Sequence, residues 1–171
     1  MRFSSLPFLF GFLPLTLAIY FAVPLRWRNL ALLLTSLVFY GWGEPVYLGI
    51  MVLSILIDYT HGLLVERYRS RDKLARWFVA ESVLLNLGLL GFFKYWDFFA
   101  ANLSLIPGVS IPTLGLPLPI GISFFTFQTM SYTVDVYRRD APAQRDIVAF
   151  GAYVTMFPQL VAGPIVRYRE V

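Results

Sequence analysis

Long apolar runs separated by short polar or basic turns make up almost the whole chain. A helix needs about 20 apolar residues to cross a hydrocarbon core of about 30 Å. On this basis the pattern predicts six membrane-spanning helices, of which the second is short, at residues 3–25, 29–43, 46–65, 77–93, 118–137 and 147–161. The sequence therefore predicts an all-α fold: a polytopic integral membrane helical bundle across residues 1–171, with no separate soluble domain.

Composition supports a membrane protein, because 58% of the residues are hydrophobic and only 14% are charged, outside the usual range of soluble domains. The formal net charge of +4 comes from basic residues that cluster between the apolar runs. That arrangement favours orientation in a bilayer over nucleic-acid binding, which needs one basic patch with interleaved aromatics. The absence of cysteine excludes disulfides, thiolate metal sites and a cysteine nucleophile.

The distribution of Lys and Arg predicts the topology, because these residues accumulate in short cytoplasmic loops. With the N-terminus outside, the inner side holds Arg26, Arg28, Arg67, Arg69, Arg71, Lys73, Arg76, Arg138, Arg139 and Arg145. The outer side then holds only Arg2, Lys94, Arg167 and Arg169. This bias predicts an outward N-terminus and six crossings.

A polar stripe marks the fifth predicted helix. Gln128, Ser131 and Asp135 are three and four residues apart, so they share one helical face. Polar groups at lipid depth are costly unless they face protein or a water-filled cavity, so we expect these residues to line a cavity. Near the C-terminal end of the sixth predicted helix, Gln159 and Arg167 either belong to a capped helix end or face the substrate. The sequence does not decide between these two alternatives.

Further charged and uncharged segments of the chain allow more than one interpretation. Asp58 and His61 could form a proton relay or half of a metal site, but we expect both at the membrane boundary beside the basic segment 66–76. Lys94 and Asp97 are three residues apart and can pair. The uncharged segment 98–134 contains several prolines before the fifth helix, and its apolar character favours packing against membrane helices over an outer loop.

Several motifs in this chain resemble the membrane-bound O-acyltransferase family, and in particular its bacterial members that acetylate exported polysaccharides. They are LVFYGWGEP at 37–45, LGLLGFFKYWDFF at 87–99, LPIGISFFTFQTMSYTVDVY at 118–137 and FPQLVAGPIVRY at 157–168. Their order and extent resemble the N-terminal part of such an enzyme, which implies that the predicted helices are an incomplete part of a larger bundle.

The resemblance implies an enzyme that moves acetyl groups across the membrane for O-acetylation of an exported polysaccharide such as alginate. It implies acetyl-CoA as donor substrate, no bound cofactor or metal, and a bacterial inner-membrane location. Its implied partners are the lipid bilayer, a C-terminal region of the same protein, and a soluble periplasmic acetyltransferase or polysaccharide-export proteins, without nucleic acid.

The family's base is a histidine in a later helical region, so the resemblance implies no catalytic residue within residues 1–171. His61 does not occupy that motif position. We therefore expect residues 1–171 alone to be inactive.

Two other function classes remain open from the residues alone. A transporter or channel subunit would also carry polar residues inside the membrane and broken helices. No internal repeat relates the first three predicted spans to the last three, which argues against an inverted-repeat transporter. A non-catalytic scaffold of a polysaccharide secretion complex is the third possibility.

Overall fold

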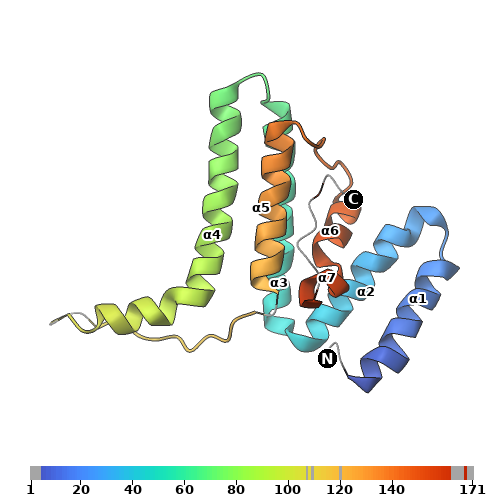
Figure 1. Ribbon diagram of the computed structural model, residues 1–171, viewed down its shortest axis with the longest axis horizontal. Helices are drawn as coiled ribbons and strands as arrows, with labels where there is room; N and C mark the ends of the chain where they lie inside the picture. Colours follow the sequence, from blue (N-terminus) through green and yellow to red (C-terminus); the bar gives the residue numbers. More distant parts are fainter. Residues whose placement is uncertain (1–4, 107, 109, 120, 163–167, 169–171) are drawn as a thin grey trace.

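The computed structural model in Figure 1 describes residues 5–106, 108, 110–119, 121–162 and 168, and every regular element in these residues is a helix. In chain order the helices are η1 (Phe8–Phe12), α1 (Leu13–Ala22), η2 (Leu25–Trp27), α2 (Arg28–Gly43), α3 (Pro45–Arg67), α4 (Asp72–Leu103), α5 (Ile122–Arg138), α6 (Ile147–Thr155) and α7 (Phe157–Ala162). The predicted all-α class is confirmed.

The helices follow the apolar runs, but their lengths differ from the prediction. Two of them, α3 and α4, are long and apolar enough to cross a membrane. The first and last apolar runs form shorter helices, because Pro7 precedes a π-helical turn and Met156 separates α6 from α7. Two spans are thus supported by length and composition, and six crossings remain a prediction.

The lower part of α4 turns aside from the bundle, and the chain then returns along the same end of the molecule (Figure 1). This return segment is held by Asp97, whose carboxylate oxygens accept the N–H groups of Leu114 at 2.7 Å and Gly115 at 3.0 Å. The Lys94 ammonium instead lies 5.5 Å from the centroid of the Tyr95 ring, and no ion pair with Asp97 is formed among the described residues. Residues 112–118 are exposed, so this segment does not pack between the described helices as expected.

The core is built around α5, which packs against α3 and α4 on one side and against α6 and α7 on another. Met51, Phe125, Tyr132 and Phe150 are almost fully buried where these helices meet. A second aromatic cluster of Phe8, Phe39 and Phe157 joins the N-terminal helices to α2 and α7. The α3–α4–α5 unit therefore forms a continuous packed frame.

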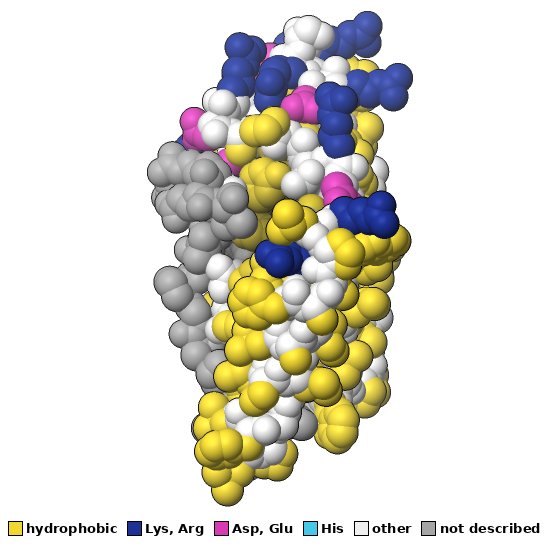
Figure 2. All heavy atoms as spheres, turned by 90° about the vertical axis from the view of Figure 1, so that its right-hand side faces the viewer, with side chains coloured by type: hydrophobic (Ala, Val, Ile, Leu, Met, Phe, Trp, Pro, Cys, Tyr) yellow, Lys and Arg dark blue, Asp and Glu magenta, His cyan; other side chains and the backbone are white. Residues whose placement is uncertain are grey.

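Basic side chains gather at the end where α3 meets α4 and where α5 ends, while the surface below is largely hydrophobic (Figure 2). Side chains tie the two turns at this end together. Arg69 donates to the Val136 carbonyl at 3.1 Å, and the Tyr137 hydroxyl donates to Asp72 at 2.9 Å. Glu66 accepts the Ala143 N–H at 3.1 Å, which fixes the segment between α5 and α6.

Candidate functional site

A buried carboxylate lies where α3, α4 and α5 meet. Asp58 on α3 is 0% exposed. Its Oδ1 accepts from the Ser82 hydroxyl at 2.7 Å, and the Asn86 amide donates to both carboxylate oxygens at 2.8 and 2.9 Å. Buried charge is tolerated only where hydrogen bonds replace lost water, and here two side chains of α4 supply them. Asp58 is thus enclosed among the three helices, and its position at the membrane boundary stays a prediction.

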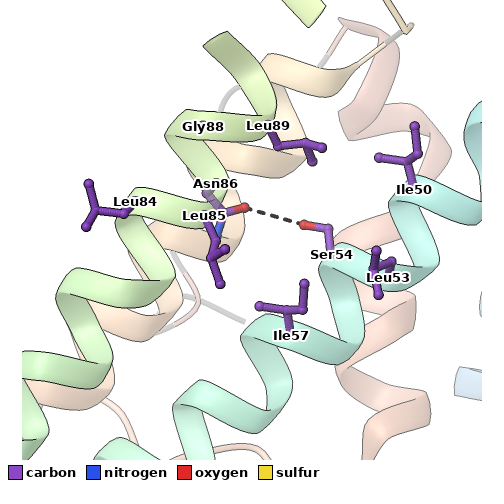
Figure 3. Close-up of a pocket in the computed structure, with 9 residues that line it drawn as sticks. All are labelled: Ile50, Leu53, Ser54, Ile57, Leu84, Leu85, Asn86, Gly88 and Leu89. Carbon is purple, nitrogen blue, oxygen red and sulfur yellow. Dashed lines mark hydrogen bonds between the residues drawn. The ribbon is translucent and has the colours of Figure 1, made fainter. Parts of the chain in front are cut away.

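The hydrogen bonds continue from Asn86 to the neighbouring helices. Its carbonyl Oδ1 accepts from Thr129 on α5 at 3.3 Å and from Ser54 on α3 at 3.4 Å. Figure 3 shows Ser54 and Asn86 facing each other beside a hollow of about 350 Å³, which is otherwise lined by apolar side chains of α3 and α4. The polar network of Asp58, Ser82, Asn86, Thr129 and Ser54 thus links all three helices of the frame.

His61 takes no part in this network. One ring nitrogen, Nδ1, lies 2.7 Å from the Ile57 carbonyl, and Nε2 lies 3.5 Å from a Glu81 carboxylate oxygen. The acid nearest to its ring among the described ion pairs is therefore Glu81 on α4. Within the described part of the chain, no group of three His, Asp or Glu side chains is arranged to hold a metal ion.

The residues of the predicted polar stripe do not all have the same environment. Gln128 is buried, and its amide donates to the Tyr153 carbonyl at 2.9 Å and to Gln159 Oε1 at 3.4 Å. The structure therefore brings Gln128 and Gln159 together, where they join α5 to α6 and α7. Ser131 donates to the Gln128 carbonyl within its own helix at 2.8 Å. Arg167 lies outside the described residues.

Asp135, the third member of the stripe, is different because one oxygen of its buried carboxylate has no hydrogen-bond partner among the described residues. The side chain is 6% exposed, and Oδ2 has no hydrogen-bond partner among the described residues. It lines an open pocket of about 280 Å³ together with Val83 of α4 and, from α5, Phe127, Met130, Ser131, Val134 and Arg138. Ser131 and Asp135 thus both line this pocket, and their role in substrate binding stays a prediction.

Comparison with known proteins yields close relatives along the whole chain. A protein of Azotobacter vinelandii named probable alginate O-acetylase AlgI is 41% identical over 100% of this chain, which covers 35% of that relative. The protein of the same name from Pseudomonas aeruginosa is 38% identical over 100% of this chain and 34% of its own length. The peptidoglycan O-acetyltransferase of Helicobacter pylori is 33% identical over 99% of this chain and 37% of its own length. No family model and no solved structure matches the chain.

The chain belongs to this family of O-acetyltransferases. It spans about a third of the length of the curated relatives it matches. The family membership expected from the motifs is confirmed.

Most of the Asp58 network was not predicted from the sequence. Ser82 and Asn86 are four residues apart in an apolar run, which places them on one helical face, and Thr129 and Thr133 repeat that spacing on α5. The Thr133 hydroxyl lies 3.3 Å from that of Ser82. The same argument that identified the Gln128 stripe would have found these two pairs.

Proposed function

We propose that this chain is part of a multi-pass inner-membrane enzyme that transfers acetyl groups from a cytoplasmic donor to hydroxyl groups of an exported polysaccharide. The observation that carries the proposal is similarity over the whole chain to proteins named alginate O-acetylase and peptidoglycan O-acetyltransferase. Alginate, or another exported polysaccharide, is the acceptor class, reached directly or through a soluble periplasmic acetyltransferase. Acetyl-CoA is the proposed donor.

In this enzyme the chain supplies a rigid frame and one wall of a cavity. The Asp58 network supports the frame, because Ser82 and Asn86 of α4 both bond a carboxylate of α3. Ser131 and Asp135 support the cavity, because both residues line an open pocket beside α4. Acyl transfer to a hydroxyl needs a base, and His61 is held between Ile57 and Glu81. We propose that the base lies on a part of the enzyme outside this chain.

Acetyl transfer by the full-length gene product in proteoliposomes tests the proposal. Radiolabelled acetyl-CoA is supplied on the side of the basic turns, with alginate oligosaccharides or peptidoglycan fragments on the other side. We expect label in ester linkage on one acceptor, transfer retained by His61→Ala, and background transfer by residues 1–171 alone. Passage of label without ester formation would identify a transporter and contradict the enzyme assignment.

A further inference from the structure

The end of α4 projects sideways from the bundle, and the chain returns alongside it (Figure 1). Residues 92–103 are here called the arm, and residues 110–118 the strap. The arm continues α4, which is long and apolar enough to cross a membrane, and it lies at the end of the molecule opposite the basic turns. If α4 crosses the bilayer, the arm is therefore at the membrane surface on the other side from the basic turns.

Polar groups of the arm and the strap bond to each other. The Asp97 carboxylate accepts two backbone N–H groups of the strap. Ser104, directly after the arm, accepts the Ile111 N–H at 3.1 Å, and Trp96 Nε1 donates to the Pro112 carbonyl at 3.3 Å. Irregular backbone beside hydrocarbon must be satisfied within the protein, because lipid tails offer no hydrogen bonds. The strap meets much of this requirement through the arm.

The surface of the arm that points away from the strap is apolar. Its exposed large side chains are Phe98 (62%), Phe99 (57%), Tyr95 (46%), Leu103 (43%) and Phe92 (40%). At 3.6 residues per turn, these side chains spread over about 140° of the helix, on the side opposite Asp97. This spread is wider than the stripe of about 100° with which a helix typically packs against protein. A fluid layer of lipid therefore fits this surface better than a single protein partner.

The polar side chains on this surface also fit a phospholipid. Lys94 is exposed, and a lysine at a bilayer surface extends its ammonium to the lipid phosphates while its stem stays in apolar surroundings. Asn102 donates its amide to the Phe98 carbonyl of the same helix at 2.7 Å. A bound sugar chain would need polar partners for many hydroxyl groups, since an unpaired buried hydroxyl is costly. The arm is thus better suited to lipid than to polysaccharide.

We propose that the arm lies in the headgroup region of the leaflet opposite the basic turns and binds phospholipid there. Its aromatic rings enter the upper acyl region, Lys94 meets the phosphates, and the strap covers the arm on the water side. Aromatic residues are typical of this depth, as are helices with Phe and Leu on an apolar face. The inference rests on the membrane location proposed above and goes beyond acetyl transfer, because it concerns how the protein is seated in the bilayer.

Spin labelling of the full-length gene product, in nanodiscs of phosphatidylethanolamine and phosphatidylglycerol, tests this position. Labels at Tyr95→Cys and Phe99→Cys report on the arm, and a label at Thr113→Cys reports on the strap, once any cysteines outside this chain are replaced. Leu84→Cys, exposed on α4 before the arm, is the lipid reference, and Ser70→Cys in the basic turn is the water reference. Collisions with oxygen report lipid, and collisions with a water-soluble nickel chelate report water. We expect both arm labels to be oxygen-dominated but shallower than the lipid reference, and the strap label to be nickel-dominated.

A charge placed on the arm gives a second measurement. Phe98→Asp should raise the nickel collision rate of the Tyr95→Cys label about twofold or more, because a carboxylate is driven out of lipid. The matched control is Thr113→Asp on the exposed strap, which should leave that rate unchanged. If Phe98→Asp does not fold, the labels in the otherwise unchanged protein decide.

Three outcomes would overturn the proposal. Nickel-dominated collisions at Phe99→Cys would place the arm in water, and low rates with both reagents would mean that protein covers it. Protection from nickel only after alginate oligosaccharides are added would identify a sugar-binding surface instead. Acetyl transfer is measured on the same labelled proteins. Normal transfer with the arm in water would reject this inference and leave the enzyme assignment standing, whereas an arm in lipid without any transfer would do the reverse.

Discussion

At the scale of single residues, Ser82 and Asn86 supply the short hydrogen bonds to the buried Asp58 carboxylate. Asn86 is the key partner, because its amide donates to both carboxylate oxygens and its carbonyl accepts from two other helices. A buried polar network is stabilising only when its members are satisfied, since any unpaired member keeps its full desolvation cost. One substitution at Asn86 therefore affects three helices.

We predict that Asn86→Ala destabilises the protein by about 3 kcal/mol, because it removes the amide that donates to both oxygens of the buried Asp58 carboxylate. The control is Asn102→Ala on the same helix, where an exposed amide donates only to the Phe98 carbonyl. Chemical unfolding in detergent, followed by circular dichroism, measures both variants. Equal effects of the two substitutions would contradict a special role for the network.

At the scale of elements, α5 determines the arrangement of its neighbours. One face carries Thr129 and Thr133 towards α3 and α4, and another carries Gln128 towards α6. Gly121, with a φ of 77°, adopts the left-handed conformation directly before the helix, which is why α5 begins at Ile122 rather than at the predicted residue 118. Its polar stripe was predictable from spacing, because large amides and carboxylates contrast with the apolar run.

The other features of these helices were harder to predict from the sequence. Thr129 and Thr133 escaped notice because a threonine can satisfy its hydroxyl on its own helix, as Thr133 also does at the Thr129 carbonyl. The burial of Asp58 was not predicted, because burial depends on which helices pack together and the periodicity of a sequence does not determine that packing. The turn of α4 was not predicted since the helix contains no proline, although Gly88 and Gly91 lie within it.

Close packing between α3 and α5 gives a second prediction. A Cβ added to Gly62 would collide with the Tyr132 ring, whose hydroxyl accepts the Gln144 N–H at 3.1 Å. We expect Gly62→Ala to destabilise the protein by about 1–3 kcal/mol through overpacking. Gly49→Ala in the same helix is the control, because no atom lies within 4 Å of the added Cβ, and it should be neutral or stabilising. A thermal melt of each variant distinguishes them, and a tolerated Gly62→Ala would contradict this packing.

At the scale of the whole molecule, charge and apolar surface are separated along the long direction of the helices (Figure 2). The turns after α1, α3 and α5 point towards one end, and the return segment after α4 lies at the other (Figure 1). This alternation matches the arrangement that the Lys and Arg distribution predicts. It supports placing the basic turns in the cytoplasm, where such residues accumulate.

Cysteine labelling tests that topology, because the chain has no native cysteine. Ser70→Cys, in the exposed turn between α3 and α4, should react with a membrane-impermeant maleimide only after the inner membrane is opened. Ser110→Cys, in the exposed segment before α5, should react in intact spheroplasts. The opposite labelling pattern would contradict the predicted orientation.

The N-terminal hairpin is shorter than the frame beside it. With 16 residues, α2 extends over about 24 Å, while the hydrocarbon core is about 30 Å thick. The turn between α1 and α2 accordingly reaches only part of the way towards the end occupied by the α3–α4 turn (Figure 1). If α2 crosses a bilayer, as the sequence predicts, its short length creates hydrophobic mismatch on one flank, and local thinning of the bilayer keeps Arg26 and Arg28 hydrated. Lipid chain length should therefore affect the stability of the protein on this side only, and lipids with shorter chains should favour the native hairpin.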